Sequence, residues 1–175
     1  MTEDLRYPIG KWQRQPAIDA AERARLIDAI AATPASLRAA VRGLSDGQLD
    51  TPYRDGGWTP RQIVHHVADS HMNAYIRFKL GVTENRPAIK TYEESLWAET
   101  IDGRTAPVDV SLAIIDNVHL RWVQFLRSID DADYARALQH PEYGAMTLDD
   151  LLQLYGWHGR HHTTHITRLR ERKAW

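Results

Sequence analysis

The chain has 175 residues, of which 43% are hydrophobic and 26% charged, and its formal net charge is −1. These values are ordinary for one soluble domain with a sizeable core, and the balanced charge gives no reason to expect nucleic acid or an anionic membrane as a partner. The absence of cysteine excludes disulfides, thiolate metal ligands and a cysteine nucleophile.

A single domain spanning residues 1–175 is expected, in the cytoplasm. Residues 1–15 lack the apolar run of a signal peptide, and no stretch approaches the ~20 apolar residues that a membrane span needs. Residues 1–16 show no periodicity and are predicted to form an N-terminal arm.

Four long helices are predicted along the chain. Residues 18–41 follow a helical pattern that Pro34 should kink or break near Thr33. A glycine-rich loop at residues 43–57 precedes Thr59-Pro60-Arg61-Gln62, which has the order of a helix start: a capping threonine, a proline at the first position and a capping-box glutamine. This helix should run to about residue 81.

The second half of the chain supplies the other two helices. Residues 82–107 are mixed, with a short helix expected at 92–99, and a long helix is predicted at 108–129. Residues 130–146 are predicted to be a connection, and Thr147 with Asp150 gives a weaker capping signal for a last helix at about 148–170. Strand signals are sparse, so the pattern favours an all-α four-helix bundle.

Histidine is unusually abundant, with nine residues, seven of which lie in two short segments. In the last helix His158 and His162 are four residues apart and share one face. They belong to an inward stripe made of Leu151, Tyr155, His158, His162, His165 and Leu169. A single histidine there would most simply be a hydrogen-bonded core residue, but one cation would give both imidazoles of the pair a shared partner. The pair therefore favours a metal site.

Neighbouring histidines leave a second register open. His161 lies one residue off the stripe, at its edge or in solvent, and His165 lies one turn beyond His162. The pair His161 and His165 is also four residues apart and competes as a ligand pair. Alternatively, His165 supports a ligand from outside or forms a pocket wall.

The second helix carries the adjacent pair His65 and His66, of which one can face inward. His66 groups with the apolar residues Ile63 and Val67, whereas His65 groups with more polar positions that we expect to be solvated. Periodicity favours His66 without excluding His65. His119 and His140 are expected to be surface or hydrogen-bonded histidines.

Three histidine ligands leave one coordination position free. Catalytic zinc sites have this arrangement, with water in the fourth place, whereas structural sites are closed. A metal with an open position activates water near neutral pH. Zinc is the first expectation for imidazole ligands, and nickel is an alternative.

Several motifs resemble a known family. They lie at residues 7–10, 51–59, 65–73, 75–80 and 157–166. With them the chain resembles, over essentially its whole length, the DinB-like superfamily and its YfiT group of metal-dependent hydrolases. The resemblance implies a four-helix bundle, a cytoplasmic homodimer and one divalent metal held by three histidines. The family's first metal ligand is the histidine directly before a hydrophobic-Ala-acidic step, which here is His66. Its other two ligands lie four residues apart on the last helix, and the resemblance assigns them to His158 and His162.

The resemblance leaves three functions open. The first is a hydrolase acting on a small molecule that the sequence does not identify; Asp69 is either a partner of the site or a solvated side chain. The second is a thiol S-transferase, because relatives use low-molecular-weight thiols such as bacillithiol, with Arg77, Lys79 and Arg160 as candidate contacts. The third is a non-catalytic metal protein with a full coordination shell, in which His165 or another side chain is the fourth ligand.

Overall fold

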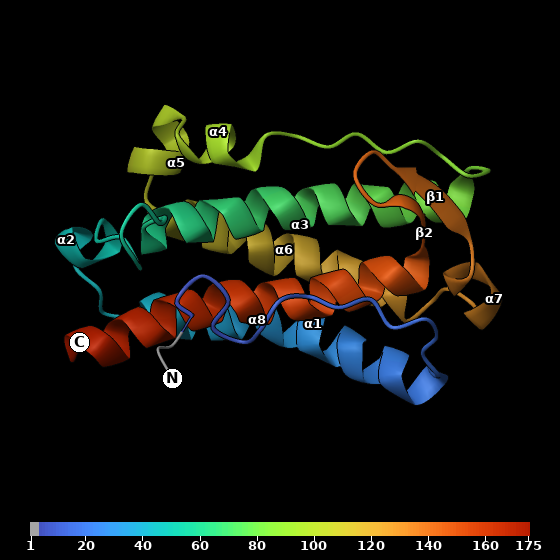
Figure 1. Cartoon of the computed structure of the whole chain (residues 1–175), viewed down its shortest axis with the longest axis horizontal. Coiled ribbons are helices and arrows are strands. Elements are labelled where there is room, and N and C mark those ends of the chain that lie inside the picture. The colour runs from blue at the N-terminus through green and yellow to red at the C-terminus, as the bar shows by residue number, and fades with distance from the viewer. Residues whose placement is uncertain (1–3) are drawn as a thin grey trace.

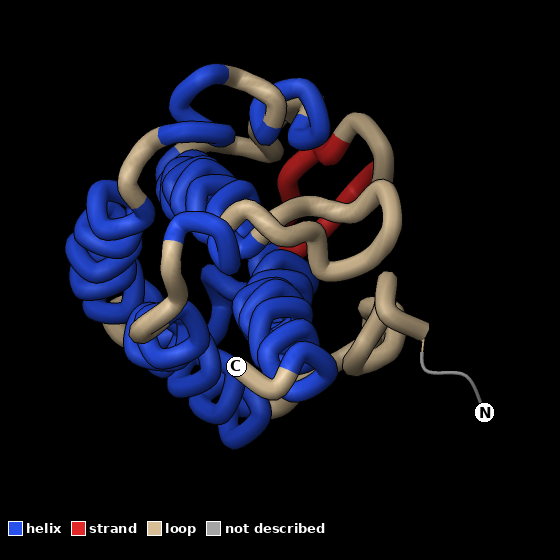
Figure 2. Tube along the Cα trace, turned by 90° about the vertical axis from the view of Figure 1, so that its left-hand side faces the viewer, coloured by secondary structure: helices blue, strands red, loops and turns tan. Residues whose placement is uncertain are grey.

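The computed structural model describes residues 4–175, and four long helices form its core. They are α1 (Ala20–Val41), α3 (Pro60–Thr83), α6 (Val108–Leu126) and α8 (Leu148–Lys173). Each of α1 and α3 packs against both α6 and α8. Figure 2, which looks along the bundle, shows these helices nearly end-on. The predicted four-helix bundle is confirmed.

Contacts between the helices give their directions. Near the end of α3, Gly81 meets Leu148 at the start of α8, and near the start of α3, His66 meets His158 farther along α8, so these two helices are antiparallel. On α3 and α6, His65 bonds to Ser111 and His71 to His119, so this pair is parallel.

Helix α1 runs the same way as α8. Arg23 near the start of α1 pairs with Asp149 at the start of α8, and Arg170 near the end of α8 donates to the carbonyl of Ala40. Helices α1 and α8 therefore point one way along the bundle, and α3 and α6 point the other way.

Parallel neighbours need a crossover connection, and residues 84–107 provide it between α3 and α6. This segment returns along α3 (Figure 1) and contains α4 (Glu94–Ala98) and α5 (Ile101–Thr105). Gln62 donates to the Ala98 carbonyl at 2.9 Å, and His65 Nε2 lies 3.1 Å from the Ala106 carbonyl. The expectation that His65 faces solvent is therefore wrong, because the crossover covers that face of α3.

Helix starts follow the predicted capping chemistry. Thr59 and Thr147 each accept a bond from the backbone N–H three residues later, and the Gln62 and Asp150 side chains bond back. A third capping box, at Ser45, begins the short α2 (Asp46–Leu49). Pro34 does not break α1, which continues to Val41.

A β-hairpin occupies part of the segment that the sequence predicts to be a plain connection. After α7 (Asp131–Tyr134), β1 (Ala137–His140) pairs antiparallel with β2 (Gly144–Thr147). Gly144 has a φ of +70° at the turn, a conformation that favours glycine. Four-residue strands give too short an alternation to detect, which explains why the sequence pattern missed them.

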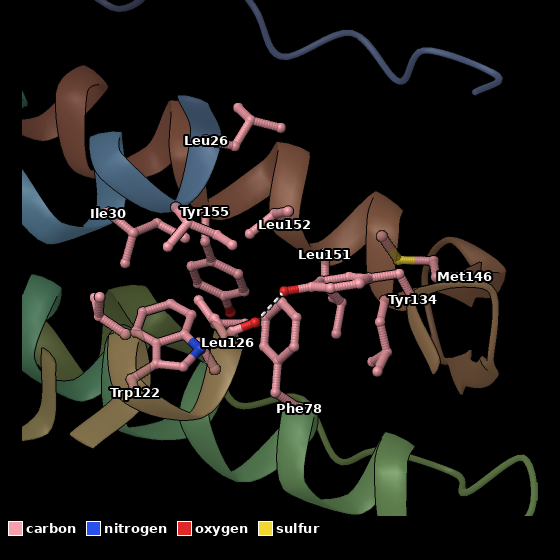
Figure 3. Packing of buried hydrophobic residues seen from close by; sticks show 14 of the residues in the cluster. Leu26, Ile30, Phe78, Trp122, Leu126, Tyr134, Met146, Leu151, Leu152 and Tyr155 are labelled. Carbon is pink, nitrogen blue, oxygen red and sulfur yellow. Dashed lines mark hydrogen bonds between the residues drawn. The ribbon is translucent and has the colours of Figure 1, made fainter. Parts of the chain in front are cut away.

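Apolar side chains form two clusters, one toward each end of the bundle. The first cluster includes Trp122, Phe78 and Tyr155, and the Tyr134 hydroxyl donates to the Leu126 carbonyl within it (Figure 3). The second includes residues earlier in α3 and α6 and later in α1 and α8: Leu37, Ile63, Ile115, Ile166 and Leu169. Between the two clusters α3, α6 and α8 place His71, His119 and His158. The core is thus interrupted by a layer of histidine.

The N-terminal arm runs along α8, antiparallel to it, as the trace in Figure 1 also shows. The Gln15 N–H donates to Gln153 at 2.8 Å, Trp157 Nε1 donates to the Gly10 carbonyl at 3.1 Å, and His165 Nε2 lies 3.1 Å from the Arg6 carbonyl. Over residues 4–175, no helix has the length and apolarity needed to cross a bilayer.

Candidate metal centre

A cavity of about 550 Å³ opens beside α3 and α8. Its walls come from the arm, the loop before α3, the crossover segment and the hairpin. Six of the nine histidines line it: His66, His140, His158, His161, His162 and His165. The bundle therefore gathers residues far apart in the sequence into one imidazole-rich pocket.

His66, His158 and His162 form a group that could hold a metal ion, with one ligand atom of each within 4.8 Å of the others. The Nε2 atoms of His66 and His158 are 3.3 Å apart. Tetrahedral zinc with Zn–N bonds of about 2.0–2.1 Å requires nitrogens separated by about 3.3 Å. The spacing of these two donors therefore fits a tetrahedral metal.

His162 supports the same fit. Its Nδ1 is buried and has no hydrogen-bond partner among residues 4–175. Leaving such an atom unpaired costs ~1–3 kcal/mol, a cost that a cation bound to this nitrogen would offset. Burial lowers the pKa of His66 to about 4 and that of His162 well below its usual range, so both rings are neutral near pH 7, as metal ligands must be.

A second group, His161 with His162 and His165, meets the same distance condition. The Nδ1 atoms of His161 and His165 are also buried and unpaired. Against this register, His165 Nε2 donates to the Arg6 carbonyl, and the His165 ring stacks on Tyr53 at 4.1 Å. The structure thus also brings His161 and His165 together, and this second group shares His162 with the first.

His65 is not part of either group. Its Nδ1 is 2.7 Å from the Ser111 hydroxyl and its Nε2 is 3.1 Å from the Ala106 carbonyl, so both nitrogens have partners. It does not line the cavity. The adjacent His66 does, under the Trp58 ring, whose centroid is 4.6 Å from its own.

His158 is supported from the core by two further histidines. Its Nδ1 lies 3.1 Å from His71 Nε2, and His71 Nδ1 lies 2.7 Å from His119 Nε2. His119 Nδ1 in turn lies 2.9 Å from the Ile30 carbonyl. Both supporting rings are buried. Metal-binding histidines commonly have such a partner on the nitrogen away from the metal.

Sequence reasoning gave these two residues no role. His119 was expected to be a surface or hydrogen-bonded histidine, and it is buried and hydrogen-bonded. A signal was available, because His119 follows Ile115 by four residues and precedes Trp122 by three, on the apolar stripe of α6. His140, the other such case, is also buried, and its Nδ1 accepts from the Glu142 N–H at 3.1 Å.

The charged residues that the sequence suggested for the site differ in whether they line the cavity. Arg77 is 8% exposed and lines the cavity, whereas Lys79 and Arg160 do not line it. Asp69 also lies outside the lining, and burial raises its pKa to about 6, with a smaller contribution from Asp102. Asp69 is therefore not among the side chains facing a substrate in the cavity.

Comparison with known proteins agrees with the fold and the histidine cluster. The profile of the DinB superfamily matches residues 29–166. A Bacillus mycoides protein named "putative metal-dependent hydrolase" is 52% identical over 99% of both chains. YfiT from Bacillus subtilis, which carries the same name, is 47% identical over 98% of this chain and 97% of its own.

Solved structures also match the fold, among them the following two. That of YfiT, described as a probable metal-dependent hydrolase with an unusual four-helix bundle topology, matches with a TM-score of 0.95 at 47% identity, over 98% of this chain and 99% of that one. TT2238, described as a four-helix bundle protein, matches with a TM-score of 0.57 at 19% identity, over 87% of this chain and 99% of that one, which shows the fold alone. The profile and the close relatives together establish that the chain belongs to the DinB superfamily.

Proposed function

We propose that this chain is a metal-dependent hydrolase whose divalent metal is bound by His66, His158 and His162. The observation that carries the proposal is the 3.3 Å separation of the His66 and His158 Nε2 atoms beside His162, whose buried Nδ1 is unpaired, in the wall of a cavity large enough for a small molecule. The names of the close relatives support the same activity.

The side chains of this chain have separate tasks in such a reaction. When bound, a divalent metal with a free coordination position lowers the pKa of water and so provides a nucleophile near neutral pH. The three imidazoles hold that metal at the cavity wall, and Trp58 packs over His66. Glu94 and Glu142 are the carboxylates among the described lining residues, and both are exposed.

The surroundings of Arg77 favour a substrate that carries an anionic group. Its Nη atoms donate to the Tyr155 hydroxyl at 3.1 Å and to the Lys90 carbonyl at 3.0 Å, and its Nε is buried without a partner. A guanidinium has five N–H donors, and no described carboxylate forms an ion pair with this one. A buried cation with only neutral partners is costly, and a substrate carboxylate or phosphate in the cavity would offset that cost.

The test of hydrolysis is a substrate screen on zinc-loaded and nickel-loaded protein prepared without a histidine tag. Esters, amides and phosphate esters that carry an anionic group form the first panel, and matched neutral compounds form the second. Metal-dependent turnover that His66→Ala abolishes would support the proposal. Turnover that survives both removal of the metal and His66→Ala would contradict it.

A thiol S-transferase with the same metal site is the second candidate. The arginine side chains at the cavity favour it, because Arg6 and Arg54 line the cavity together with Arg77 and would suit an anionic low-molecular-weight thiol. Incubation of an electrophile with bacillithiol, and separately with water alone, distinguishes the two reactions. Product formation only in the presence of the thiol would assign the transferase activity.

A further inference from the structure

A proline inside α1 changes the hydrogen bonding of one buried carbonyl. In an α-helix the carbonyl of residue 30 accepts from the N–H of residue 34, but residue 34 is proline and has no N–H. The Ile30 carbonyl is instead 2.9 Å from Nδ1 of His119, a ring that is 2% exposed. The proline thus leaves this acceptor available to another helix.

A carbonyl can only accept, so the contact fixes the direction of the hydrogen bonds that follow. His119 Nδ1 must carry the proton, and in a neutral ring its Nε2 is then an acceptor. The contact of 2.7 Å makes His71 Nδ1 the donor to that acceptor, which leaves His71 Nε2 to accept. The contact of 3.1 Å then makes His158 Nδ1 the donor to His71. If every donor and acceptor in these contacts were exchanged, unprotonated His119 Nδ1 would face the Ile30 carbonyl, and two acceptors would lie 2.9 Å apart.

We propose that His119 and His71 are positioning residues that hold His158 in the Nδ1–H tautomer, so that its Nε2 lone pair faces His66 and the metal. His158 Nε2 lies 3.3 Å from His66 Nε2. Because His158 Nε2 carries no proton in this tautomer, His66 Nε2 must donate to it when no metal is bound. For both Nε2 atoms to bind a metal, only His66 would have to change tautomer, with its proton moving from Nε2 to Nδ1, because His158 already has a free Nε2 lone pair. This inference rests on the proposed metal site and adds its support in the core.

The tautomers can be observed without any metal. In the full-length, metal-free protein labelled with ¹⁵N at histidine, long-range ¹H–¹⁵N correlations identify which ring nitrogen carries the proton. The proposal expects Nδ1–H for His119, His71 and His158. His158 protonated on Nε2 would overturn it, whether or not the protein proves to be a hydrolase.

Zinc affinity, measured by competition with a chromophoric chelator, tests the effect on binding. His119→Phe removes the acceptor for His71 and should weaken zinc binding by roughly 10–100-fold, the range seen when outer partners of metal ligands are lost. His119→Gln keeps an oxygen that can accept from His71 and should recover part of that loss. His65→Phe removes another buried histidine, one that is bonded to Ser111 and lies outside the series His119, His71 and His158, and it is the control that should retain the parent affinity.

Two outcomes separate this proposal from the proposed function. If the parent binds zinc but hydrolyses nothing, the hydrolase proposal fails. The zinc affinities of the His119 variants still test whether His119 and His71 position His158. If His119→Phe folds and binds zinc as tightly as the parent, the positioning role is overturned. If His119→Phe does not fold, Pro34→Ala serves in its place, because it supplies an N–H that competes for the Ile30 carbonyl. In this variant the Nδ1–H tautomers of His119, His71 and His158 should be less populated than in the parent, and unchanged tautomers would contradict the proposal.

Discussion

Nδ1 of His119 on α6 donates to the carbonyl of Ile30 on α1 across 2.9 Å, in the layer between the two apolar clusters. The bond explains why the core tolerates a histidine there, since both ring nitrogens of His119 have hydrogen-bond partners. It also joins α1, which contributes no side chain to the cavity lining, to the candidate metal ligand His158 through His71.

Acid should destabilise the metal-free protein. Burial lowers the pKa of His66 and of His119 from an unperturbed 6.5 to about 4, and it also lowers the pKa values of His71 and His158 well below 6.5. Because the folded pKa values lie below the unfolded ones, the unfolded chain takes up more protons as the pH falls below about 6.5. The free energy of unfolding should therefore fall between pH 6.5 and 4, by up to ~1.4 kcal/mol per pH unit for each histidine. Urea unfolding at several pH values checks this, and a constant free energy over that interval would contradict it.

Asp69 should contribute the opposite dependence. Its folded pKa of about 6 lies above the unperturbed 3.8, so the folded state favours the protonated carboxyl and stability is lost as the pH rises through 6. Asp69→Asn should thus be more stable than the parent at pH 7 and show no gain near pH 4. The difference between the two unfolding curves isolates this group from the histidines. An equal difference at both pH values would show that ionisation of Asp69 is not the cause.

Close packing of α1 on α8 should make Gly159 sensitive to substitution. A Cβ at residue 159 would lie 2.5 Å from Thr33 Oγ1 and 2.8 Å from its Cγ2. Gly159→Ala should therefore cost about 1–3 kcal/mol of unfolding free energy through overpacking. Gly47→Ala is the matched control, because a Cβ there meets nothing within 4 Å. Denaturant unfolding of both variants checks the prediction, and equal stabilities would refute it.

Arg77 should determine affinity for anionic ligands. Hydroxamates that carry a carboxylate tail are suitable probes, compared with the same compounds carrying an amide tail. The Arg77 position lies eleven residues beyond His66, about 16 Å along α3, so the tail needs several carbons. Arg77→Gln should weaken binding of the carboxylate form by roughly tenfold or more, the worth of a hydrogen bond between charged groups, and leave the amide form unchanged.

Lys79→Gln provides the matched control for this measurement. Lys79 lies on the same helix, but its Nζ is over the Phe125 ring at 4.4 Å and it does not line the cavity. Isothermal titration should therefore give the parent affinities for both tails. If Arg77→Gln and Lys79→Gln behave alike, Arg77 is not an anion-binding residue.

Local sequence signals predicted the helices well. The capping boxes at Thr59 and Thr147 depend on residues three positions apart, so they can be recognised without the fold. The inward stripe of α8 likewise follows from spacing, and it placed His158, His162 and His165 on the face toward the cavity.

Other features depend on contacts between distant segments. His65 is buried because the crossover lies over it, and that return path cannot be read from the periodicity of α3. The series from His119 to His158 joins α6, α3 and α8, and its starting carbonyl is on α1. Pro34 was recognised as a departure from helix chemistry, but its effect on Ile30 becomes visible only where another helix supplies the donor.

Metal content of ligand variants tests the central claim most directly. Untagged parent protein, loaded with zinc and dialysed, should hold one zinc per chain. His66→Ala and His158→Ala should each lose most of it, whereas His161→Ala and His165→Ala should retain it. Because His162 belongs to both histidine groups, only these four variants separate them. Zinc retained by His66→Ala and lost by His161→Ala or His165→Ala would contradict the account and assign the metal to the other group.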